Sequence, residues 1–323
     1  MFYDDLLFFN VEEITEDGKI LRFQEDLICQ LGCEAHKRGR FYGYRSIGAE
    51  LRFVTESKFF DLKLRADKED TTIYIFFGDY MHHSYILKEG VITNLHVEIP
   101  EKFYRLREQL PKDAFHSNVI RIVIGYSGYV SYIGLNTYGK RRPPRKEEMP
   151  ARTLLVYGSS ISHGSEALEY INSYPFLLSR LCHMDVINKS IPGSCQAEAV
   201  MCNYLQTIQT DQAFVEFGVN VVELYTLEEY KRHLTMLLDS LQAKQIYFTS
   251  VLDNGAIFDH ASHSFQMLME FRAYAQSLKQ YMYIEPSTLL NGVSALTTDL
   301  LHPSDYGQLQ IALALSKIIE IKE

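Results

Sequence analysis

With 323 residues, 46% of them hydrophobic and 23% charged, the chain has a globular composition and room for two domains of ordinary size. The formal net charge of −9, without a basic stripe, argues against nucleic acid or an anionic membrane surface as a partner. The N-terminus is acidic where a signal peptide is basic, and no stretch approaches the roughly 20 apolar residues of a membrane span. The cysteines lack disulfide or zinc spacing, which predicts reduced thiols in a cytoplasmic protein. They are Cys29, Cys33, Cys182, Cys195 and Cys202.

The first 140 residues are predicted to form an antiparallel β-sandwich. Apolar and polar residues alternate in short runs, for example at 49–53, 60–65 and 95–99, and turn residues separate the runs. A period of two is typical of strands that bury one face. Residues 100–110 are the exception, where a short helix or a long crossing loop fits the pattern.

Residues 141–152 are predicted to be an interdomain linker. Between Gly139 and Arg152 the sequence has three prolines, five basic residues ahead of a Glu pair, and no large apolar residue except Met149. Such a composition is typical of a solvated connector. The predicted domains are therefore 1–140 and 153–323.

From residue 153 onward, predicted strands alternate with predicted helices. The strands are expected at 153–157, 184–188, 213–217, 245–250 and 282–285. The helices are expected at 165–181 (interrupted by Pro175), 195–207, 226–242, 262–279 and about 304–321. This alternation predicts βαβ units, and hence a five-stranded parallel sheet with helices on both faces.

The stretch from Leu154 to Gly164 contains the candidate nucleophile. Its apolar start predicts a buried strand, and Gly158, Ser159 and Ser160 follow where the strand ends. A serine at the start of a helix there presents both its hydroxyl and its backbone N–H to a ligand pocket. On this stretch alone, a simple helix N-cap is the favoured interpretation of the serines.

Further polar or glycine residues follow other strands and should reach the same sheet edge. Gly193 follows the second strand, where the lack of a Cβ lets a backbone N–H approach a ligand, and Asn220 follows the third. Asp299 and His302 stand just before the last helix. An Asp three residues before a His can accept the Nδ1–H and turn Nε2 toward a serine.

These residues, in this order, resemble the four motif blocks of the SGNH, or GDSL-type, serine hydrolase superfamily. The blocks are Tyr157-Gly158-Ser159-Ser160, Gly193, Gly218-Val219-Asn220 and Asp299-Leu300-Leu301-His302-Pro303. The β-rich first domain is similar to that of a subgroup with a jelly-roll domain ahead of the hydrolase. Two positions differ from the common pattern: Ser159 replaces an Asp, and Val221 replaces an Asp that often follows the Asn.

The resemblance implies a flavodoxin-like three-layer α/β/α domain and a role for each motif residue. Ser160 would be the nucleophile, His302 the general base and Asp299 the group that orients the histidine. The N–H groups of Ser160 and Gly193 and the amide of Asn220 would form the oxyanion hole. No metal and no organic cofactor is expected.

Other polar residues are weaker candidates. His163 either lines the acyl pocket or covers the first helical turn, and Asp253 and Asn254 either touch substrate or form a turn. His260 and His263 have a spacing that suits a metal, but without a third ligand nearby a loop flanking the pocket is the favoured interpretation.

The sequence therefore predicts a serine esterase that removes a small acyl group, in particular O-acetyl, from a carbohydrate or similar polyol. The expected partner is a small acylated sugar, with no nucleic acid and no membrane, and an oligomer is open. Two alternatives stay open as well. One is an acyltransferase that uses the same acyl-enzyme, and the other is a catalytically silent carbohydrate-binding protein.

Overall fold

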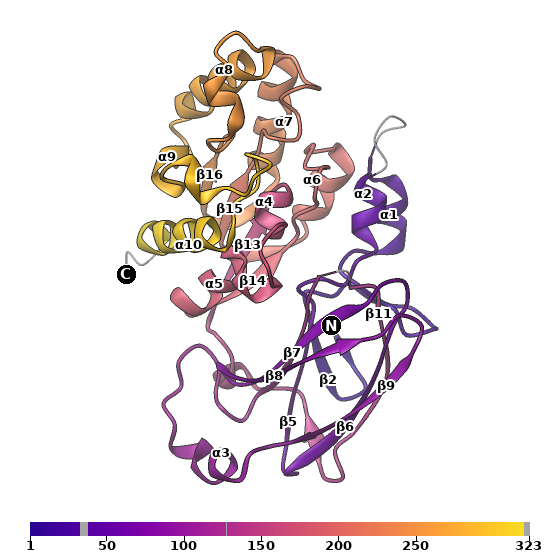
Figure 1. Cartoon of the computed structure of the whole chain (residues 1–323). Coiled ribbons are helices and arrows are strands. Elements are labelled where there is room, and N and C mark those ends of the chain that lie inside the picture. Colours follow the sequence, from indigo (N-terminus) through magenta and orange to yellow (C-terminus); the bar gives the residue numbers. More distant parts are fainter. Residues whose placement is uncertain (33–37, 127, 320–323) are drawn as a thin grey trace. The chain divides into compact units, whose positions relative to one another are not determined.

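The computed structural model describes residues 1–32, 38–126 and 128–319, and the chain divides into two compact units (Figure 1). The first unit comprises Met1–Glu25 and Gly43–Ala151, and the second comprises Asp26–Tyr42 and Arg152–Glu323. The short stretch Asp26–Tyr42, which we call the inserted segment, therefore belongs with the second unit although it lies early in the sequence. Cys33 lies outside the described residues; Cys29 is exposed, and Cys182, Cys195 and Cys202 are buried.

The first unit consists mainly of two antiparallel sheets. The larger sheet contains, in spatial order, β1 (Phe2–Tyr3), β2 (Leu6–Phe9), β5 (Glu50–Thr55), β10 (Ile120–Ile124), β7 (Thr71–Phe77) and β8 (Tyr80–Leu87), and β12 (Arg141–Arg142) also pairs with β5. The smaller sheet contains β11 (Val130–Asn136), β6 (Phe59–Ala66) and β9 (Ile92–Glu98), and β3 (Glu13–Ile14) pairs with β4 (Ile20–Leu21). Alternate residues of both sheets share one buried core, in which the rings of Phe53 and Phe60 meet at 5.2 Å. The predicted antiparallel sandwich is confirmed.

Helices interrupt the strands of this region at two places. The alternative of a short helix within 100–110 is the correct one, since α3 spans Glu101–Leu106 and a 3₁₀ turn follows at Arg107–Gln109. The all-β prediction is wrong for α1 (Glu25–Gln30) and α2 (Arg38–Gly43). Leu27, Ile28 and Leu31 are buried at a helical spacing that a search for period-two runs does not detect.

The second unit is built on the predicted parallel sheet of five strands. Their spatial order is β14 (Met184–Asn188), β13 (Arg152–Tyr157), β15 (Gln209–Glu216), β16 (Gln242–Thr249) and β17 (Met282–Tyr283). Each neighbouring pair is parallel. The residues that follow β13, β14 and β15 therefore meet at one edge of the sheet.

Helices cover both faces of this sheet (Figure 1). Leu154 and Val156 point into a core with α5 (Tyr174–Leu181) and α10 (Asp305–Ile319), while α7 (Leu227–Ser240) and α8 (His263–Ser277) lie on the opposite face. The remaining short helices are α6 (Ala199–Leu205) and α9 (Pro286–Leu289). The three-layer α/β/α prediction is confirmed.

One predicted helix is wrong in its extent. Within the expected range 165–181, the structure has a 3₁₀ turn at Tyr170–Asn172 and then α5, and the short helix α4 (Ser160–His163) precedes that range. Pro175 lies in the first turn of α5, because proline lacks an N–H and its ring clashes with a preceding helical turn. The nucleophile candidate is consequently carried by a helix of one turn.

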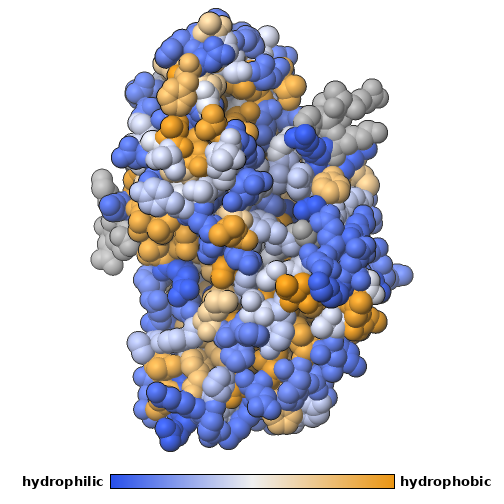
Figure 2. All heavy atoms as spheres, in the orientation of Figure 1, coloured by the Kyte–Doolittle hydropathy of each residue, from blue (hydrophilic) through white to orange (hydrophobic). Residues whose placement is uncertain are grey.

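Hydrophilic side chains cover most of the face drawn in Figure 2, and apolar side chains occur there in small groups. Within the described part of the chain, every helix is too short or too polar to cross a lipid bilayer.

Candidate active site

The turn after β13 places Ser160 at the first position of α4. Ser159 is the N-cap, and its hydroxyl accepts a hydrogen bond from the Ile161 N–H at 3.1 Å. Gly164 ends the helix in the left-handed conformation, with φ of 92°. Capping is therefore the task of Ser159, and the hydroxyl of Ser160 is left for another partner.

That partner is His302. The Oγ atom of Ser160 lies 2.7 Å from Nε2 of His302, and Nδ1 of the same ring lies 2.6 Å from Oδ2 of Asp299. Ser160 is 8% exposed, and the imidazole is largely covered. The structure thus brings the three predicted triad residues into one continuous hydrogen-bonded chain.

The loop before α10 holds Asp299 in place. Its Oδ1 atom accepts hydrogen bonds from the Thr297 hydroxyl and from the N–H groups of Leu301 and His302 at 2.8, 2.8 and 3.0 Å. Partial burial raises the pKa of Asp299, but the hydrogen bonds, led by that from the His302 ring, outweigh it and hold the pKa well below its usual range. The carboxylate is therefore ionised and suited to orienting an imidazole and stabilising its protonated form.

The predicted oxyanion residues lie on loops tied to the same turn. The Ile191 N–H donates to the Gly158 carbonyl at 3.0 Å, which anchors the loop that carries Gly193, and Gly193 has φ of +61°. Oδ1 of Asn220 accepts the Cys195 N–H at 3.0 Å. Because its oxygen is engaged, the amide nitrogen of Asn220 is the group left to donate to a ligand.

The inserted segment borders this loop, which the sequence analysis did not anticipate. A Cβ built on Gly193 would lie 3.0 Å from Cδ and 3.1 Å from Nη1 of Arg38. The Gly32 N–H donates to the Glu198 carboxylate at 2.6 Å, and the Tyr42 ring meets the His163 ring at 6.1 Å. Gly32, Arg38 and Tyr42, all from the first 45 residues, thus lie beside the residues of the candidate active site.

The predicted substrate-pocket residues are engaged in local structure. His163 is buried in the first turn of α4, with Nδ1 3.3 Å from the Ser165 hydroxyl. Asp253 forms an ion pair with Arg272 at 2.7 Å, and Asn254 caps the 3₁₀ turn Gly255–Phe258. The Gly255 N–H donates to the Leu300 carbonyl, so this turn packs beside the Asp299 loop. These contacts favour covering and turn-forming roles over direct substrate contact.

The two histidines considered as metal ligands lie at the start of α8. His260 precedes the helix and its ring packs on Phe265, whereas His263 is the first helical residue. Among residues 1–32, 38–126 and 128–319, no three His, Cys, Asp or Glu side chains gather in a metal-binding arrangement. His260 thus lies in the loop before α8 and His263 in the first turn of the helix, and a place beside the pocket stays a prediction.

Glu216, the last residue of β15, is a further polar residue at this edge of the sheet. Its carboxylate accepts hydrogen bonds from Ser159 and Ser162, which flank the nucleophile in the sequence. The signal for it was an acidic residue inside the apolar run Ala213–Phe217.

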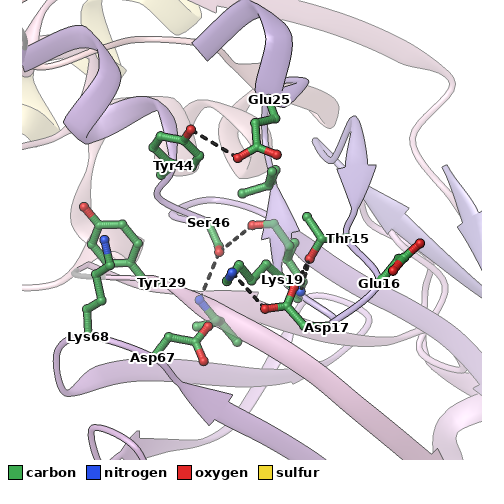
Figure 3. A pocket seen from close by; sticks show the side chains of 13 residues that line it. Thr15, Glu16, Asp17, Lys19, Glu25, Tyr44, Ser46, Asp67, Lys68 and Tyr129 are labelled. Carbon is green, nitrogen blue, oxygen red and sulfur yellow. Dashed lines mark hydrogen bonds and ion pairs between the residues drawn. The ribbon is translucent and has the colours of Figure 1, made fainter. Parts of the chain in front are cut away.

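A separate cavity of about 480 Å³ lies within the first unit (Figure 3). Most of its polar lining groups bond one another: Lys19 pairs with Asp17 at 2.8 Å, and the Tyr44 hydroxyl donates to Glu25. All lining residues belong to the sandwich, and no residue of the Ser160 chain is among them. The candidate active site and this cavity are therefore different places.

A parallel α/β sheet with a Ser–His–Asp hydrogen-bond chain at its carboxyl edge defines a serine hydrolase. The model of the GDSL-like lipase/acylhydrolase family matches residues 151–320, more than half of the chain, and the chain belongs to this family. It is an SGNH-type enzyme that acts on ester bonds.

Solved structures share the fold over nearly the whole chain, although their sequences differ widely. Salicylyl-acyltransferase SsfX3 from a tetracycline biosynthetic pathway aligns with a TM-score of 0.76 and 12% identity, covering 97% of this chain and 93% of that one. A protein described as a GDSL-like lipase from Bacteroides ovatus aligns with a TM-score of 0.67 and 18% identity, covering 98% of this chain and 97% of that one. A family two carbohydrate esterase from Cellvibrio japonicus aligns with a TM-score of 0.63 and 15% identity, covering 98% of this chain and 94% of that one. The comparison with curated protein sequences gave no match.

Proposed function

We propose that the enzyme hydrolyses small acyl esters, in particular O-acetyl esters of a carbohydrate or similar polyol, through an acyl-serine at Ser160. The observation that carries the proposal is the chain from Ser160 Oγ to His302 Nε2 and from Nδ1 to Asp299, with distances of 2.7 and 2.6 Å. Similarity to the fold of a carbohydrate esterase supports a carbohydrate as the alcohol part of the ester substrate.

Ser160 Oγ would attack the ester carbonyl carbon while His302 Nε2 takes its proton. The negative charge on the former carbonyl oxygen would be bound by the N–H groups of Ser160 and Gly193 and by the Asn220 amide. The bond to the alcohol oxygen then breaks, and His302 returns the proton to that oxygen. Water, deprotonated by the same imidazole, attacks the acyl-serine, and the proton finally returns to Ser160 as the acid leaves.

The test is stopped-flow hydrolysis of p-nitrophenyl acetate together with fluorophosphonate labelling located by mass spectrometry. Ser160→Ala should lower turnover at least about 10⁴-fold, as loss of a triad nucleophile does. Ser179→Ala on α5, whose hydroxyl donates to the Phe176 carbonyl within its own helix, is the matched control and should keep full turnover. Turnover retained in Ser160→Ala, or label on Ser159, would contradict the assignment of the nucleophile.

An acyltransferase with the same acyl-enzyme is the second candidate, and the similarity in fold to a salicylyl-acyltransferase favours it. Transfer of acetyl from the aryl ester to an added sugar, measured against acetate release, separates the two. Family membership and the intact hydrogen-bond chain speak against the third alternative, a catalytically silent carbohydrate-binding protein.

A further inference from the structure

Glu216 lies directly against the turn that carries the proposed nucleophile. Its Oε2 atom accepts hydrogen bonds from the Ser159 N–H at 2.8 Å, the Ser159 hydroxyl at 2.6 Å and the Ser162 hydroxyl at 3.2 Å. The residue is 1% exposed. One carboxylate oxygen thus binds both Ser159 and Ser162, the residues directly before and after the pair Ser160-Ile161.

The packing between this carboxylate and the turn leaves no spare room. A Cβ built on Gly158 would lie 2.9 Å from Oε2 of Glu216 and would collide with the hydroxyl of Ser162. The Ser159 hydroxyl donates to Glu216 while it accepts the Ile161 N–H, so the carboxylate fixes the group that caps α4. A shift of Glu216 would therefore move the start of the helix on which Ser160 sits.

No cation balances the charge of this group among the residues that the structure describes. The titratable side chains that face it are Tyr174 on α5, Cys195 in the loop after β14 and Tyr230 on α7, and burial raises the pKa of each, which keeps them neutral. Burial also raises the pKa of Glu216 to about 7, against the opposing hydrogen bonds from Ser159 and Ser162. Its Oε1 atom is buried and has no hydrogen-bond partner within residues 1–32, 38–126 and 128–319. An arrangement so costly for stability points to a functional reason.

We propose that Glu216 is a positioning residue that holds the nucleophile turn in its reactive geometry through the hydroxyls of Ser159 and Ser162. The inference rests on the proposed role of Ser160. It also accounts for the absence of the family's common Asp at position 159: the serine supplies the cap, and the carboxylate comes from the neighbouring strand instead. The ionised form is the effective one, because hydrogen bonds to a charged acceptor are stronger than those to a neutral one.

Glu216→Gln tests this because glutamine imitates the protonated carboxyl. We expect kcat to fall about tenfold near pH 8.5, where the wild-type carboxylate is ionised, and less than about threefold near pH 6, with KM unchanged. The ratio of wild-type kcat to variant kcat should rise as the pH passes through about 7, where Glu216 ionises. A kcat ratio that stays constant with pH, or equal kcat of wild type and variant at both pH values, would overturn the proposal in favour of a passive packing role.

Glu198→Gln is the matched control. Glu198 is another acidic side chain of this unit whose pKa is raised by burial, and it accepts the Gly32 N–H instead of groups of the turn. For Glu198→Gln, the ratio of wild-type kcat to variant kcat should not change with pH. The same pH-dependent ratio in this control would mean that loss of any buried carboxyl produces the effect, and the proposal would be wrong.

The double variant Ser159→Asp/Glu216→Gln returns a carboxylate to the turn. We expect it to recover the activity at pH 8.5 to within about threefold of wild type. No recovery over Glu216→Gln alone would contradict the exchange of roles between positions 159 and 216.

The rate of Ser160 phosphonylation by a fluorophosphonate, measured at both pH values, keeps the two proposals apart. This rate reports the nucleophile without an ester substrate. Labelling that follows the expected pH-dependent ratio, without turnover of any ester, would reject the proposed function and retain the role of Glu216. Ester turnover with a labelling ratio independent of pH would do the opposite.

Discussion

A buried glutamate lies in a sheet of each unit, Glu50 in the first and Glu216 in the second, and their pKa values are shifted in opposite directions. Glu50 in the sandwich receives hydrogen bonds from Arg52 at 2.8 Å and from Arg121 at 2.8 and 2.9 Å. Burial alone would raise its pKa, but the two guanidinium groups lower it to about 2. Glu216 in the α/β unit accepts hydrogen bonds from hydroxyl and amide groups, and burial raises its pKa to about 7.

The surroundings of the two carboxylates explain this difference. The Arg52 guanidinium stacks on the Phe9 ring at 3.8 Å, and that of Arg121 stacks on Phe115 at 3.9 Å. Arg121 also lies 3.7 Å from Asp79, so two guanidinium groups balance two carboxylates in this group of four residues, which we call the Glu50 cluster. Charge neutrality and stacking make the cluster a structural element in which Glu50 stays ionised. A carboxylate without a cation is sensitive to pH and is suited to a site where hydrogen-bond geometry matters. Burial alone therefore says little about the purpose of a carboxylate, and its partners say more.

Removing a cation from the balanced cluster should have the largest effect. Arg121→Met leaves the Glu50 and Asp79 carboxylates with Arg52 alone, and we expect a loss of about 3–5 kcal/mol in the free energy of unfolding of the sandwich. Arg65→Met is the matched control, since Arg65 pairs with Asp67 at 2.5 Å but is one-third exposed; there we expect about 1 kcal/mol or less. Denaturant-dependent hydrogen exchange of β5 and β10 peptides measures both. Equal losses in the two variants would show that the Glu50 cluster has no special role.

The two glutamates should also respond to pH with opposite signs. Glu50 binds its proton less tightly in the folded state, so its contribution is present above about pH 4.5 and is lost as pH falls toward about 2. Glu216 binds its proton more tightly in the folded state, so its contribution is present below about pH 4.5 and is lost as pH rises through about 7. Each contribution is about 3 kcal/mol at most.

Glu216→Gln isolates the second contribution. The variant should be more stable than wild type by about 1–3 kcal/mol at pH 8.5 and nearly equal to it at pH 5, because glutamine is never ionised. Hydrogen exchange of the β15 peptide at both pH values measures the difference. A variant that is less stable than wild type at pH 8.5 would show that the ionised carboxylate does not strain the fold.

Much of the candidate active site was predictable from the sequence because its residues follow strands of a parallel sheet. Once the strands before Ser160, Gly193 and Asn220 were recognised, topology alone brought these residues to one edge. The Asp299–His302 pair was predictable because its geometry is local, set by three residues of chain. The family resemblance added the roles.

What escaped prediction depends on contacts between distant residues. The inserted segment joins the second unit through Gly32 and Glu198, which are 166 residues apart. Glu216 meets Ser159 across 57 residues, and its position in an apolar strand gives no indication of which groups it contacts. Periodicity reveals which elements form, but not which side chains of neighbouring strands and turns bond one another.

The smallest expected effect lies at the far end of the Glu216 network. The buried Tyr174 hydroxyl donates to the Ser162 hydroxyl at 2.6 Å, which in turn donates to Glu216. Tyr174→Phe removes that outer donor, so we expect about 1 kcal/mol less stability and a decrease in kcat of about twofold to threefold.

Tyr230→Phe is its control, since the buried Tyr230 hydroxyl is 3.0 Å from that of Ser250 and does not bond to the turn. It should lose similar stability with unchanged kcat, as measured by urea unfolding and by hydrolysis of p-nitrophenyl acetate. An equal decrease in kcat in both variants would mean that general loosening of the unit slows the enzyme. A decrease confined to Tyr174→Phe would show that the network transmits position to Ser160 even when its carboxylate is intact.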